Sequence, residues 1–104
     1  MPLTRAEIEA LAPDQASLKA ASGLLKPAKW LSRSRDAAGG LIWGECQGSG
    51  ANPYRVVADT ADHGTKCTCP SRKFPCKHAL ALMWMHAEDA LAFAESAPPE
   101  WVFD

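Results

Sequence analysis

Three cysteines and one histidine lie within twelve residues of this 104-residue chain, and together they offer a complete ligand set for a metal ion. They are Cys67, Cys69, Cys76 and His78, in the spacing C-x-C-x6-C-x-H. Three thiolates and one imidazole can fill the tetrahedral shell that zinc prefers. Because four protein ligands leave no open position for water or substrate, the spacing predicts one structural Zn²⁺ ion and not a catalytic one.

The residues around these ligands indicate how they are brought together. Side chains i and i+2 of an extended strand share one face, so Cys67 and Cys69 are expected to project together from a strand end. Cys76 and His78 stand before the apolar run 79–85, where a helix is expected to begin. We therefore expect a zinc-stapled β–β–α unit. The alternative is a chance grouping in which the thiols are merely buried.

On these residues the segment 67–78 resembles the SWIM zinc finger, a family named for its occurrence in chromatin-remodelling ATPases and plant mutator-type transposases, with the pattern C-x-C-x(n)-C-x-H. The resemblance extends to 41–50 and 53–56, which are similar to the strand region before the finger in small bacterial members. It implies a binding module for DNA or protein, and it carries the four zinc ligands over unchanged. Such modules usually lie inside longer chains, whereas this chain ends soon after the finger.

The distribution of charge indicates where a partner could bind. The net charge of −1 argues against a strongly basic nucleic-acid binder. From residue 66 to residue 87, however, the chain has no acidic residue and four basic ones, Lys66, Arg72, Lys73 and Lys77. A second basic run, 26–35, flanks Trp30. The four residues near the ligands are our candidates for nucleic-acid contacts, although a solvated surface is the commoner origin of such a run.

Three functions stay open at this point. The first is nucleic-acid (DNA) binding through the basic face around the zinc ligands, and the second is protein–protein interaction within a larger assembly. The third is a metal or redox sensor whose thiolates release zinc on oxidation. The sequence offers no nucleophile–base pair and no open metal site, so we expect neither an enzyme nor a small-molecule substrate.

Composition and cysteine usage predict the compartment. The chain is 47% hydrophobic and 22% charged, which is ordinary for a soluble globular protein. No apolar run approaches the roughly 20 residues of a membrane span, and the start lacks the pattern of a signal peptide. Three of the four cysteines stand at zinc spacing, which favours a reducing cytoplasm over disulfides. We expect a cytoplasmic protein with no membrane partner.

The remaining patterns predict one α+β domain over 1–104. Thr4 with Glu7 forms a capping-box pattern, and Asp14 can cap a second helix, so 1–29 is expected to be helical, with helices to about Leu11 and from Gln15 to Leu25. Alternation with period two predicts an antiparallel sheet of three or four strands over 30–66. After the knuckle, 67–78, we expect a C-terminal helix over 79–96 and a tail over 97–104. Trp101 in this tail is expected to dock back on the domain, the alternative being that it belongs to a surface for a partner.

Two patterns predict which side chains are buried. In the strand 41–47, Leu41 and Trp43 are expected on one face, with Ile42 and Cys46 on the other. The C-terminal helix is apolar on more than one side, so we expect the N-terminal helices and the sheet to sandwich it, the alternative being that part of it is covered by a partner.

The chain also holds three other possible metal ligands. Cys46 is interpreted as a buried structural thiol and His63 as a solvent-facing turn residue. His86 lies two helical turns beyond His78, about 12 Å along the axis, so it is expected to pack in the helix and not to share the zinc.

Overall fold

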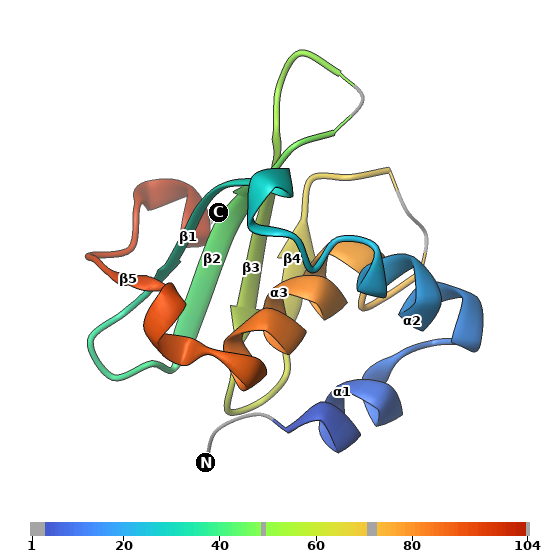
Figure 1. Cartoon of the computed structure of the whole chain (residues 1–104). Coiled ribbons are helices and arrows are strands. Elements are labelled where there is room, and N and C mark those ends of the chain that lie inside the picture. The colour runs from blue at the N-terminus through green and yellow to red at the C-terminus, as the bar shows by residue number, and fades with distance from the viewer. Residues whose placement is uncertain (1–3, 49, 71–72, 104) are drawn as a thin grey trace.

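The computed structural model describes residues 4–48, 50–70 and 73–103, in which a central helix lies between two short helices and a sheet (Figure 1). The model is α+β. In chain order its elements are α1 (Arg5–Leu11), α2 (Gln15–Ser22), η1 (Pro27–Lys29), β1 (Trp30–Arg35), β2 (Leu41–Cys46), β3 (Tyr54–Asp59), β4 (Thr65–Cys67), α3 (Lys77–Glu88), η2 (Ala90–Ala92), β5 (Ala94–Glu95) and η3 (Glu100–Phe103).

The two N-terminal helices begin where their capping residues predicted. The Thr4 hydroxyl accepts a hydrogen bond from the backbone N–H of Glu7 at 3.2 Å, and the Glu7 carboxylate accepts one from the backbone N–H of Thr4 at 3.2 Å. Asp14 accepts a hydrogen bond from the backbone N–H of Ser17 at 2.7 Å and starts α2. This helix ends at Ser22, earlier than Leu25, because the chain tightens at Gly23, a residue that disfavours helix interiors.

The sheet has the strand order β4-β3-β2-β1-β5. β1 to β4 form the predicted antiparallel meander, whose first hairpin pairs Arg35 with Ile42 and turns through Gly39 at φ +75°. The meander therefore brings β4, the strand that ends in the first zinc ligand, to one edge of the sheet.

The C-terminal helix is shorter than the sequence predicted, and a fifth strand takes its place. The prediction of a helix over 79–96 is wrong beyond Glu88, because Asp89 leaves helical geometry at φ −153° and ψ 81°. The chain then turns back so that Phe93 is buried in the core, and β5 pairs with β1 in parallel. The sheet is consequently mixed and has five strands, not three or four antiparallel ones.

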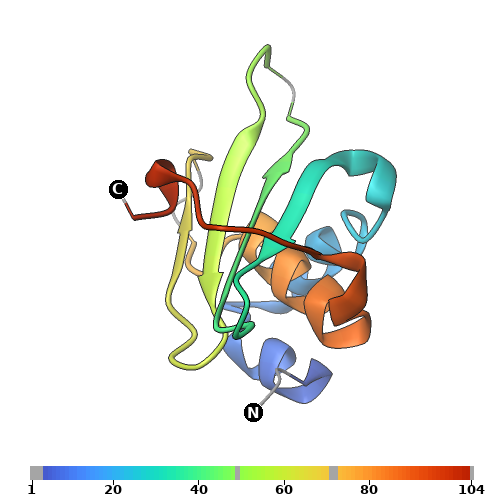
Figure 2. The ribbon, with the colours of Figure 1, turned by 90° about the vertical axis from the view of Figure 1, so that its left-hand side faces the viewer.

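The two faces of the sheet are covered by different segments. Ile42 and Cys46 of β2 pack in the main core with α3, whereas Trp43 packs on the opposite face with Val57 and Val102. The predicted alternation along β2 is thus confirmed. The chain after β5 crosses this second face towards β4 (Figure 2), and Trp101 docks there as expected.

Helix α3 is enclosed on nearly all sides. Residues 78–86 are all buried, since α1 and α2 cover one side of the helix and β2 and β3 cover the other. The expected sandwich is therefore present. Within the described parts of the chain, no helix is long and apolar enough to cross a membrane.

His86 makes folding stability depend on pH. Its imidazole is buried edge-on against Phe93 with ring centroids 5.2 Å apart, and Nδ1 has no hydrogen-bond partner among the residues that the structure describes. Burial, with a further contribution from the Arg35 charge, lowers the pKa of His86 below its ordinary value. Below about pH 6.5 the unfolded chain therefore takes up a proton that the folded protein resists, and stability falls until the pH reaches the folded-state pKa.

We expect the burial of His86 to make the free energy of unfolding fall more steeply with decreasing pH, by up to about 1.4 kcal/mol per pH unit below pH 6.5. The measurement is urea unfolding of wild type and His86→Gln between pH 7.5 and 5.5 with zinc present. Any zinc release on acidification is common to both proteins, so the difference between the two slopes isolates His86. Equal slopes would show that its burial does not oppose protonation.

Candidate metal centre

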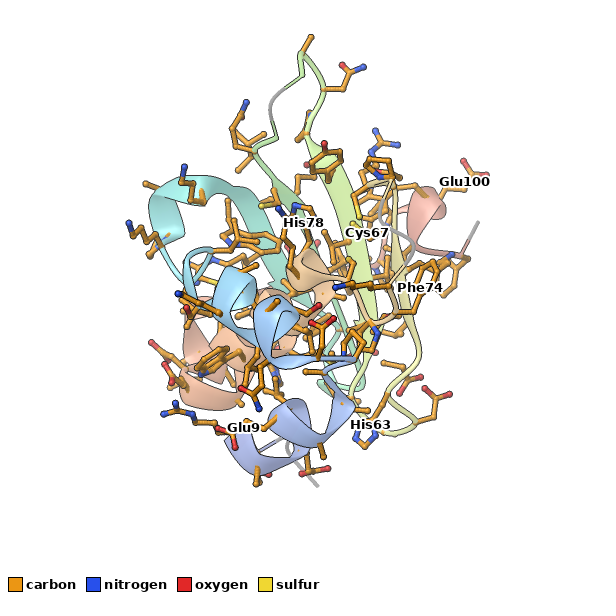
Figure 3. The ribbon with its side chains drawn as sticks, turned by 90° about the vertical axis from the view of Figure 1, so that its right-hand side faces the viewer. Glu9, His63, Cys67, Phe74, His78 and Glu100 are labelled. Carbon is orange, nitrogen blue, oxygen red and sulfur yellow. The ribbon has the colours of Figure 1, made fainter. Side chains whose placement is uncertain are left out.

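The four predicted zinc ligands come from two elements that meet at one end of α3. Cys67 is the last residue of β4 and Cys69 follows two positions later. Cys76 is the N-cap of α3, and His78 lies in the first turn of that helix. Figure 3 shows Cys67 and His78 lying beside each other, one from the sheet edge and one from the helix. The strand–helix placement expected from the spacing is what the structure has.

The ligand atoms are close enough to hold one metal ion. The three sulfur atoms and one imidazole nitrogen all lie within 4.8 Å of one another. Cys76 Sγ is 4.0 Å from His78 Nδ1. Ligands at zinc bond lengths stand about 3.5–4 Å apart in a tetrahedron, so only small shifts separate this cluster from a zinc shell. The donor set and its geometry both fit a structural Zn²⁺.

A shared proton within the cluster lowers the pKa of one of its thiols, and a thiolate is the form that binds a metal cation. A hydrogen bond from the Cys67 thiol to the Cys76 sulfur lowers the pKa of Cys76 to about 4. The same hydrogen bond, followed by burial, raises the pKa of Cys67. Sharing a proton between these two sulfurs therefore favours the thiolate form at Cys76, and metal binding releases the thiol protons that remain.

Tyr54 supports the histidine ligand, a role that the sequence did not reveal. Its ring lies 4.8 Å from the His78 imidazole between centroids, at an interplanar angle of 51°. Tyr54 is the first residue of β3, and nothing in the sequence marks it, since the contact spans 24 positions. This packing restricts the orientation of the imidazole.

The other thiol and histidines lie outside the cluster. Cys46 is fully buried in the main core, where burial raises its pKa, as expected for a structural thiol. His63 lies in the β3–β4 turn at φ +66° and is partly exposed. Its Nε2 lies 3.3 Å from Glu7 Oε2, which joins this turn to α1. His86 is packed, as predicted.

The candidate nucleic-acid residues divide between two sides of the finger. Lys73 and Lys77 line a groove of about 740 Å³ between α2, the β2–β3 loop and the finger, and Lys29 lines it too. Lys66 instead lines a second, smaller groove over β3 and β4. Arg72 lies outside the described residues.

Lys73 has an acidic neighbour in the structure. Its ammonium nitrogen is 2.5 Å from Asp14 Oδ2, and this hydrogen bond is the main reason that the pKa of Asp14 is lowered to about 2. The pair joins the finger to the N-cap of α2. Because both groups are exposed, the pair contributes little to stability and either partner can exchange it.

Comparison with known proteins agrees with this geometry. The family model of the SWIM zinc finger matches residues 54–87, from Tyr54 to the last turn of α3. No curated protein and no solved structure matched the chain. The matched segment contains the whole metal cluster, and the SWIM zinc finger is a family of binding modules. Residues 54–87 of this chain are therefore a SWIM zinc finger, with Cys67, Cys69, Cys76 and His78 positioned to hold one zinc ion.

Proposed function

We propose that this chain is a non-catalytic module that binds nucleic acid through the basic groove beside its zinc centre. The observation that carries the proposal is the convergence of Lys29, Lys73 and Lys77 on one groove, with no acidic residue among its lining side chains in the described chain. Phosphate groups bind such clusters by releasing condensed counterions. A reducing, cytoplasmic location suits the four free cysteines.

The zinc centre holds this groove in shape. With zinc bound, the end of β4 and the start of α3 are joined. Lys73 and Lys77 both lie between the second ligand, Cys69, and the last ligand, His78. Three thiolates and one Zn²⁺ add one negative charge, which the neighbouring lysines offset. The expected affinity for DNA is accordingly weak, with Kd around 10⁻⁴ to 10⁻⁵ M at physiological salt.

Lys77→Ala should weaken DNA binding and flatten its salt dependence. Each phosphate contact contributes about −0.9 to the slope of log K against log salt, so the slope should become less steep by about one. Lys19→Ala is the matched control, because Lys19 is also an exposed helical lysine but does not line the groove. The measurement is fluorescence anisotropy of labelled DNA at several salt concentrations.

Asp14→Asn tests the groove in the opposite direction. Asparagine also caps helices well, so α2 should persist while the carboxylate that pairs with Lys73 is lost. DNA binding should then tighten. If Lys77→Ala and Lys19→Ala behave alike and Asp14→Asn changes nothing, the groove is not the binding surface. No binding by wild type even at low salt would favour a protein-interaction module instead.

A further inference from the structure

A second groove lies on the other side of the finger and combines aromatic rings with cations. It has a volume of about 380 Å³ and spans β3, β4, the finger and η3. Its side chains include Phe74 and Trp101, and the basic residues Arg55 and Lys66. Within the described chain, no acidic side chain lines it.

Phe74 presents its ring to solvent beside the metal cluster. The side chain is 69% exposed, although it stands only two residues before the ligand Cys76. A single exposed aromatic residue is common on protein surfaces and means little by itself. Here Phe74 lines the same groove as a second aromatic residue, Trp101, and it stands between the ligands Cys69 and Cys76 in the sequence.

Trp101 is held by separate contacts. The next residue, Val102, is buried against Trp43 and Val57, which anchors η3 to the sheet. The Arg55 guanidinium lies over the Trp101 ring, 5.3 Å from its centroid. The backbone N–H of Arg55 donates to the Thr68 hydroxyl, and the backbone N–H of Thr68 donates to the Arg55 carbonyl. The ring and the cation are therefore already in place before any ligand binds.

The charge of this groove selects an anionic ligand. Arg55 and Lys66 are both exposed there, and the acidic residue beside Trp101, Glu100, points away from Phe74 (Figure 3). Exposed π faces next to cations match an unpaired base with its phosphate, because every base has a face that can stack on an aromatic ring. In a duplex these faces are already stacked, and only base edges and phosphates are accessible.

We infer that this second groove binds single-stranded nucleic acid, with a base stacked on Phe74 and the adjoining phosphates near Arg55 and Lys66. The inference rests on the proposed nucleic-acid function and narrows it to unpaired strands. It also gives the finger two separate contact surfaces. The basic groove contacts the phosphates of both single strands and duplexes, whereas the aromatic groove distinguishes single strands from duplexes.

The test compares a labelled dT 12-mer with a 12-base-pair duplex by anisotropy, using the zinc-loaded protein. Phe74→Ala should weaken binding of the single strand about 5- to 100-fold, as expected for one lost stacking contact, and leave duplex binding unchanged. Phe74→Leu should lose as much affinity for the single strand as Phe74→Ala, because leucine keeps an apolar side chain but has no π face. Phe74→Tyr should retain the affinity. Leu91→Ala is the control, since Leu91 is 87% exposed but lies on η2, outside this groove.

The outcomes separate this inference from the proposed function. If wild type binds duplex and single strand with equal affinity, and Phe74→Ala changes neither affinity, the aromatic groove is not a binding site. The proposal for the basic groove would be unaffected by that result. If wild type binds neither the duplex nor the single strand, both the proposed nucleic-acid function and this inference are overturned. Full affinity in Phe74→Leu, or displacement of the 12-mer by an equal concentration of polyglutamate, would show a groove for apolar or acidic peptides and would overturn the inference. Near-UV circular dichroism of each variant confirms that the fold is intact.

Discussion

Removing zinc from the purified protein is expected to unfold it. Structural zinc can contribute on the order of 10 kcal/mol or more to folding, which is comparable with the whole stability of a small domain, about 5–15 kcal/mol. Here the ligands join the edge strand β4 to α3, and α3 is the helix around which the core is built. The loss should therefore spread from the finger to the core.

Near-UV circular dichroism measures this loss directly, because Trp30 and Trp84 are buried in the same core cluster as α3. Chelation under reducing conditions should abolish the near-UV signal, and adding Zn²⁺ back should restore it. A zinc-free protein, verified by metal analysis, that keeps an undisturbed near-UV spectrum would contradict the structural role of the metal.

The second large effect is expected from replacing single thiols. Cys69→Ser and Cys76→Ser should abolish zinc binding at one equivalent per chain, because three remaining ligands leave the shell incomplete. Cys46→Ser is the matched control with the same change of atoms. It should lower stability by about 1–3 kcal/mol, since it places a hydroxyl in an apolar core, yet keep full zinc stoichiometry.

Zinc content per folded chain, measured by native mass spectrometry, decides between these outcomes. Stability curves for the same variants show whether a loss of metal reflects a missing ligand or a fold that has collapsed. Loss of zinc in Cys46→Ser together with a metallated Cys69→Ser would show that the ligand set is misassigned.

Features set by short-range rules could be predicted from the sequence. The caps at Thr4 and Asp14 need only residues within three positions, and the zinc ligands lie within one segment of twelve. The two-faced burial of β2 follows from the alternation of side chains along a strand. In each case the determining contacts are local in sequence, or the alternation of side chains along the strand alone fixes which residues face the core.

Features set by distant contacts could not be predicted in this way. The helical pattern continues past Glu88, but burial of Phe93 and pairing of β5 with β1 end the helix there. At the site, the Lys73–Asp14 pair spans 59 positions. The groove between Phe74 and Trp101 likewise depends on how the tail crosses the sheet. Local patterns carry no information about such pairings.

The most direct test of the zinc centre is X-ray absorption at the zinc edge of the purified, reduced protein. The account predicts one zinc per chain with three sulfur neighbours at about 2.3 Å and one nitrogen neighbour at about 2.0–2.1 Å, with the scattering signature of imidazole. These are the donors of Cys67, Cys69, Cys76 and His78. A shell of four sulfurs, or one containing oxygen from solvent, would contradict the closed three-cysteine, one-histidine site.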